Sequence, residues 1–185
     1  FRSEILPLIH ANAGAVLLGY WAYLLVSLAM IPLVFSFRQW AIGRGYASWW
    51  LDPLTFVGAA AGILKTLGIV RWLTVMPMLA QEYVGAPPAA RQPIELSYRV
   101  MNSYAGSVGE LLGVQLTSGL WLVGAGAILM RLGYRVLGAW GSLAGLLFVA
   151  TCARTALPEL AALQSIAVPL VLVWFAVFAV RVGRP

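Results

Sequence analysis

The sequence has little of the chemistry on which most active sites depend. Among 185 residues it contains one cysteine, Cys152, and one histidine, His10. A single cysteine excludes an intramolecular disulfide and any metal site built from several cysteines. A single histidine excludes a haem held by two histidines of this chain and argues against a zinc site. We therefore predict no cofactor or metal, except that His10 is compatible with a pigment or haem shared with a partner chain.

Charge is also scarce, and apolar residues dominate. Charged residues make up 10% of the chain and hydrophobic residues 62%, with a mean hydropathy of +0.89. A soluble domain of this length needs more polar surface. The formal net charge is +6, but the basic residues are scattered between apolar segments, which argues against a nucleic-acid partner. The composition predicts an all-α, polytopic transmembrane helical bundle in contact with the lipid bilayer.

Five apolar segments are long enough to cross a bilayer. The predicted spans of this single transmembrane domain cover residues 12–37, 53–80, 98–131, 136–153 and 160–180. We predict a headgroup-level loop at 38–52, where arginines lie among tryptophans. A second loop is predicted at 81–97, with a helix beginning near Pro93. Because the third span exceeds what a bilayer needs, it either tilts strongly or projects from the membrane.

Basic residues are divided unevenly between the two ends of these spans. One side carries a single acidic residue, Asp52, against six arginines: Arg38, Arg44, Arg131, Arg135, Arg181 and Arg184. The other side balances its charges: Arg2, Arg91, Arg99 and Arg154 against Glu4, Glu82, Glu95 and Glu159. The positive-inside rule therefore predicts a cytoplasmic C-terminus and Phe1 on the periplasmic side. This orientation also predicts a sixth helix upstream of Phe1. The preference for arginine over lysine in an Ala/Leu/Gly-rich background is typical of a bacterial inner-membrane protein.

The segment 99–118 concentrates polar side chains inside the apolar chain. Wound as an α-helix, it brings small and polar residues onto one face: Arg99, Ser103, Gly106, Glu110, Gly113 and Thr117. Glycine-rich faces let membrane helices approach closely, so this face is predicted to pack inside the bundle.

Ionisable residues inside the predicted spans are the candidate functional residues. Glu110 is the only acidic one, and Lys65 and Arg71 of the second span are its candidate partners. By helical face Lys65 is the better partner, whereas by depth Arg71 is better, and we favour Arg71. The pair either fixes helix register or marks a substrate or proton pathway with Asn102 and Gln115. A third hypothesis places Glu110 at the lipid headgroups.

On the outer part of the same helix, Arg99 and Glu95 lie four residues apart, a spacing that predicts a surface ion pair.

One segment carries a family resemblance. Residues 131–145, Arg-Leu-Gly-Tyr-Arg-Val-Leu-Gly-Ala-Trp-Gly-Ser-Leu-Ala-Gly, follow the long polar-faced helix and contain the pair Leu137-Gly138. Over residues 12–181 the chain resembles a family of six-helix bacterial membrane proteins of unknown function. Members usually carry a proline in this turn, where the present chain has Tyr134-Arg135. The resemblance implies a compact helical bundle with an upstream helix and carries over no catalytic residues.

Three hypotheses for function follow. The chain has no Ser/His/Asp set, because Asp52 and His10 are predicted on opposite sides of the membrane. The leading hypothesis is therefore a non-catalytic accessory or scaffold subunit that packs beside other membrane proteins. The alternative is a small transporter or ligand-binding bundle with an outward-facing polar cavity around Glu110. A membrane enzyme is the third hypothesis.

Overall fold

The computed structural model describes residues 4–182, apart from the side chains of Thr155, Ala161 and Val182. In chain order the elements are α1 (Ile5–Ala11), α2 (Ala13–Gly43), α3 (Leu51–Leu73), α4 (Val75–Gly85), α5 (Pro88–Gly106), the π-helix η1 (Ser107–Ser118), α6 (Gly119–Arg131), α7 (Arg135–Thr151), the short 3-10 helices η2 (Cys152–Thr155) and η3 (Pro158–Ala161), and α8 (Ala162–Val182). Among residues 4–182, five helical segments are long and apolar enough to cross a membrane. The predicted all-α class with five spans is confirmed.

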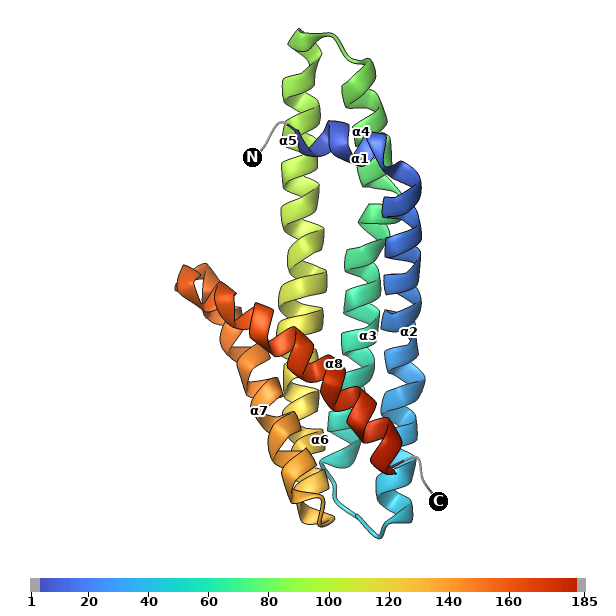
Figure 1. Cartoon of the computed structure of the whole chain (residues 1–185), viewed down its shortest axis with the longest axis vertical. Helices are drawn as coiled ribbons and strands as arrows, with labels where there is room; N and C mark the ends of the chain where they lie inside the picture. Colours follow the sequence, from blue (N-terminus) through green and yellow to red (C-terminus); the bar gives the residue numbers. More distant parts are fainter. Residues whose placement is uncertain (1–3, 183–185) are drawn as a thin grey trace.

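The long helices form an upright bundle that two slanted helices join at one end (Figure 1). Helices α2, α3 and the continuous α5–η1–α6 rod run alongside one another, while α8 crosses the lower part of the bundle diagonally. Short α1 lies across α4 at the upper end. We call this upper end, formed by α1, α4 and α5, the cap end. The opposite end, with residues 44–50 and the α6–α7 turn, is the loop end.

Both predicted loops were wrong in extent. Helix α2 continues to Gly43, so the first connection is only residues 44–50. The segment 81–97 is not a loop, because α4 runs to Gly85 and α5 begins at Pro88. The third helical segment consequently covers Pro88–Arg131 rather than 98–131. Pro93 lies inside α5, beyond its first turn, so its missing N–H leaves the carbonyl of Ala89 without its usual helical donor.

A break divides the second long helix into α3 and α4. Thr74 has φ −126° and ψ −77°, outside the helical region. Pro77 explains the position, because a proline ring collides with the carbonyl four residues earlier, here that of Leu73, and supplies no N–H to it. The Thr74 hydroxyl donates to the carbonyl of Val70 at 2.8 Å. The cap end is thus set off from the membrane-crossing α3 by a proline break.

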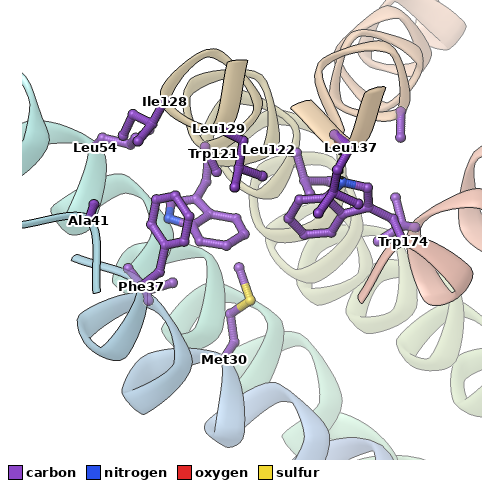
Figure 2. Close-up of a cluster of buried hydrophobic side chains, with 14 of the residues drawn as sticks. Met30, Phe37, Ala41, Leu54, Trp121, Leu122, Ile128, Leu129, Leu137 and Trp174 are labelled. Atoms are coloured by element: carbon purple, nitrogen blue, oxygen red, sulfur yellow. Dashed lines mark hydrogen bonds between the residues drawn. The ribbon is translucent and has the colours of Figure 1, made fainter. Parts of the chain in front are cut away.

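The main apolar core lies toward the loop end. It joins α2, α3, α6, α7 and α8 around two fully buried tryptophans, Trp121 and Trp174. Figure 2 shows Trp121 beside Phe37 and Trp174 next to Leu137, and the Trp121 and Phe37 rings meet edge to face at 5.6 Å. Trp174 Nε1 donates to the Leu137 carbonyl at 2.9 Å. This hydrogen bond fixes α8 against α7.

A second, smaller core lies at the cap end. It consists of Leu6 and Ile9 of α1, four residues of α4 and Tyr98 of α5; the α4 members are Met76, Leu79, Ala80 and Tyr83. Along α3 and η1, the stretch between the two cores holds the charged residues of the spans. The polar chemistry of the chain is therefore concentrated between two apolar layers.

Candidate functional site

Five stretches with almost no charged residues mark the part of each long helix that matches the hydrocarbon core of a bilayer. They cover residues 13–37, 53–70, 111–130, 136–153 and 160–180, and Lys65 is the one charged residue inside them. They are 18 to 25 residues long, within the range of helix lengths that cross a hydrocarbon core of ~30 Å. Charged residues close the stretches at the cap end: Arg71, Glu110, Arg154 and Glu159. We take this level as the cap-end boundary of the membrane.

Four helices enclose a cavity of about 160 Å³ at this boundary. Its lining residues come from α2 (Tyr20, Tyr23), α3 (Lys65, Gly68, Ile69, Arg71, Trp72), η1 (Gly109, Glu110, Val114) and α8 (Gln164, Val168). We call it the four-helix cavity. Three of the predicted ionisable candidates, Lys65, Arg71 and Glu110, therefore line one space.

The cavity owes its shape to an unusually close contact between α3 and η1. A Cβ on Gly68 would lie 2.5 Å from the Cα of Gly109, and one on Gly113 would lie 2.8 Å from the backbone N of Lys65. The two backbones therefore touch without an intervening side chain. The predicted packing role of this glycine-rich face agrees with these contacts. The Lys65 stem is held against Gly113, where the Cβ would also lie 3.0 Å from Lys65 Cγ.

The wide π-helical winding of η1 was not predicted from the sequence. A π-helix is rare and often occurs at functional sites. Its hydroxyl side chains bond to carbonyls five residues back, as in Thr117 Oγ1 to Leu112 O at 2.7 Å and Ser118 Oγ to Gly113 O at 2.8 Å. These side-chain bonds supply extra donors to the carbonyls of the widened turns.

Arg71 is a structural anchor rather than the partner of Glu110. Its side chain is 8% exposed. Nη1 donates to the carbonyl of Gly68 at 2.6 Å and Nε donates to Asn102 Oδ1 at 3.2 Å. A Cβ on Gly106 would lie 3.3 Å from Nη2, so the guanidinium fills the space that this glycine leaves. Asn102, one of the predicted site residues, therefore holds the Arg71 side chain in place.

The observed partner of Glu110 is Arg154, so the favoured Glu110–Arg71 pair was wrong. Arg154 Nη2 lies 3.1 Å from Glu110 Oε2, with side chains 28% and 49% exposed. Sequence spacing had placed Arg154 in a loop, but η2 continues directly from α7 and carries it back to η1. Arg154 Nη1 also donates to Gln164 Oε1 at 3.1 Å.

Gln115 extends this network into the protein. It is 0% exposed, and its Nε2 donates to Gln164 Oε1 at 3.3 Å. Because Gln164 Oε1 already accepts from Arg154, Gln115 must present its N–H group to it, which leaves Gln115 Oε1 as a buried acceptor. That oxygen has no hydrogen-bond partner among residues 4–182. The positive charge of Arg154 thereby fixes the orientation of the Gln164 amide, and through it that of the Gln115 amide.

Lys65 differs from the other charged residues of the site. Within the part of the chain that the structure describes, no hydrogen bond or ion pair involves its ammonium group. It lies six residues from Arg71, about 9 Å deeper along the helix axis at 1.5 Å per residue. A cation at this depth is costly unless it finds a partner or reaches the interface. Lys65 therefore brings to the cavity a positive charge without a counter-charge or a hydrogen-bond partner from the described residues.

The remaining predicted residues lie outside the cavity lining. Arg99 lines a surface hollow on α5 with Leu96 and Ser103. Its expected partner Glu95 accepts a hydrogen bond from Tyr83 Oη at 2.9 Å. His10 is exposed on α1, and among residues 4–182 no three His, Cys, Asp or Glu side chains gather as a metal site would require.

Sequence reasoning missed Arg154, Gln164 and the aromatic wall of the cavity. Tyr20 and Trp72 stack with centroids 4.6 Å apart and planes 5° apart. One signal was present, because Gln164 and Ser165 are the only polar residues of the last apolar segment. A polar side chain in such a segment usually faces the interior of the bundle.

These helices and their charge distribution define a polytopic helical membrane protein. A family model matches residues 2–183, and the chain belongs to that family, DUF4386, a domain of unknown function. The predicted resemblance to an unknown-function membrane family is thereby confirmed, while its six-helix and bacterial features stay predictions. No curated protein and no solved structure shows significant similarity to the chain.

Proposed function

We propose that this protein is a non-catalytic membrane protein that binds a small anionic molecule in the four-helix cavity. Lys65 carries this proposal, because it lines the cavity without a counter-charge from the described chain. The neighbouring Glu110 is already paired with Arg154. Lys65, Arg71 and Arg154 bring three positive charges to the site, and Glu110 brings one negative charge. An anion would supply the compensation that Lys65 lacks.

The size and lining of the cavity support a small ligand. Its volume of about 160 Å³ is close to that of an engineered ~150 Å³ protein cavity that binds benzene. The walls combine aromatic rings with a few converging polar groups, as in small-molecule sites generally. Such a space accommodates one charged group with a few attached atoms.

The orientation of the site follows from the distribution of arginines. We propose that the loop end is cytoplasmic in a bacterial inner membrane, since arginines outnumber acidic residues there. The four-helix cavity then lies in the outer half of the membrane. This position supports binding or transport of a molecule that arrives from outside the cell.

Binding of an anion is tested by thermal unfolding of the full chain in a neutral maltoside detergent. Sodium phosphate and sodium acetate are compared with sodium chloride at equal ionic strength. Bound anion raises the unfolding temperature, because it stabilises only the folded state. Lys65→Met is expected to abolish the rise, whereas Arg135→Met, which removes an exposed charge at the loop end, is expected to keep it. An equal rise in Lys65→Met and in the unmodified chain would contradict the proposal.

The accessory-subunit hypothesis stays a prediction. Large apolar side chains are exposed on α2, including Leu18, Leu25 and Phe35. Lipid covers such faces as well as a partner protein does, so they favour neither. Stoichiometric co-purification of another membrane protein in mild detergent is the result that would support an accessory role.

A further inference from the structure

We infer that the anion is the phosphate group of a membrane lipid, which enters the four-helix cavity sideways from the leaflet at the cap end. This inference rests on the proposed anion-binding function and names its ligand. It is carried by the direction in which the cavity opens, by the order of polar and apolar groups along its depth, and by the position of Lys65.

The cavity opens toward the bilayer. Its exposed lining residues, Tyr23 at 45%, Val168 at 37% and Glu110, come from three different helices. In Figure 1, α8 crosses the bundle diagonally, below the upper parts of α2 and α3. On the cap side, Trp72 lines the cavity and also packs against the cap core around Met76. The exposed side chains of α2 and α8 therefore leave the cavity open sideways, and Trp72 joins its cap side to the cap core.

Apart from Lys65, whose backbone lies deeper beside Gly113, the polar groups of the cavity lie at the boundary and apolar groups lie deeper. Arg71, Glu110 and Gln164 are at the cap-end level of α3, η1 and α8. Val114 follows Glu110, and Val168 follows Gln164, by four residues toward the loop end. An amphiphile bound with its head at the boundary places its first methylene groups against these valines.

Lys65 and the tyrosines are suited to a phosphate at this level. Lys65 lies deeper than this level, and its long stem can run along apolar surface so that the ammonium meets a phosphate at the boundary. Arg71 has two of its donors committed within the protein, so Lys65 is the free charge. Tyr20 and Tyr23 bring aromatic rings with hydroxyl groups to the same wall, as is typical of membrane-interface belts.

Native mass spectrometry of the full chain in detergent tests this inference. The probes are phosphatidylglycerol, phosphatidylcholine with the same acyl chains, and free glycerol phosphate. We expect a one-to-one complex with phosphatidylglycerol that forms about five- to tenfold more tightly than that with phosphatidylcholine, whose choline offsets the charge. Lys65→Met is expected to remove this preference, and Arg135→Met to preserve it.

A second variant keeps the test informative if Lys65→Met does not fold. Val168→Trp narrows the apolar mouth and leaves Lys65 in place, so it should weaken binding of the lipid more than that of glycerol phosphate. Equal binding of the two lipids, or an unchanged preference in both variants, would overturn the lipid inference. Binding of glycerol phosphate that depends on Lys65, without lipid preference, would overturn it while supporting the proposed function. Binding of none of the probes would overturn both.

Discussion

Gly68 and Gly109 bring α3 and η1 into backbone contact, since a Cβ on Gly68 would lie only 2.5 Å from the Cα of Gly109. Gly68→Ala must therefore push the two helices apart. We expect a loss of about 1–3 kcal/mol in the free energy of unfolding, the usual cost of overpacking. The measurement is reversible unfolding in mixed micelles.

Gly19→Ala is the matched control for this prediction. It lies inside α2 with no atom within 4 Å of an added Cβ. Alanine there should stabilise by about 0.5–1 kcal/mol through helix propensity. If Gly68→Ala and Gly19→Ala behaved alike, the close α3–η1 contact would be refuted.

The Glu110–Arg154 pair is expected to contribute little stability by itself. Both side chains are partly exposed, and pairs of this kind are worth about 0.2–1 kcal/mol. Arg154→Gln should cost more than Glu110→Gln, because Gln164 also loses a donor. A double-mutant cycle with the two substitutions measures the coupling, and a coupling of zero would show that the two groups do not pair.

Arg71 is expected to tolerate no substitution well. Arg71→Lys keeps the charge but lacks the planar fork that reaches both Gly68 and Asn102. We expect a loss of about 2 kcal/mol, the scale of hydrogen bonds to a charged group. Arg135→Lys at the exposed start of α7 is the control and should change the unfolding free energy by less than about 0.5 kcal/mol. Similar values for both variants would argue against an anchoring role.

Trp174→Phe tests how α8 is fastened. The substitution keeps an aromatic ring but removes the Nε1 donor to the Leu137 carbonyl. The Leu137 carbonyl then loses this partner but stays within the hydrogen-bond ladder of α7, so we expect a cost of about 0.5–1.5 kcal/mol. Limited proteolysis should cleave α8 earlier in the variant than in the unmodified chain. An unchanged cleavage rate would show that the apolar contacts alone hold α8.

The spans and the charged residues of the cavity were predictable because the bilayer imposes strong constraints. A charge within an apolar span must face the interior of the bundle or the interface, so Lys65, Arg71 and Glu110 stood out. Their convergence on one cavity then required only that α3 and the third helix pack by their glycines, and the Gly68–Gly109 contact is of this kind.

Physical reasons also explain why the Glu110–Arg154 pair and the extent of the loops could not be predicted. Arg154 reaches Glu110 through the path of α7 and η2, and sequence spacing says nothing about helix tilt. Proline begins helices as well as interrupting them, so Pro88 and Pro93 were indistinguishable as helix starts. The π-helical turns change which residues share a face, and no residue type in η1 predicts a π-helix.

The most direct test of the central claim is the phosphorus content of the purified protein. Full chain and Lys65→Met are extracted in parallel, washed in phosphate-free maltoside and assayed for total phosphorus per protein. The account predicts about one retained phosphate per unmodified chain, as for a single basic lipid site, and far less for Lys65→Met with Arg135→Met unchanged. Equal phosphorus in the unmodified chain and Lys65→Met would contradict a phosphate held by Lys65.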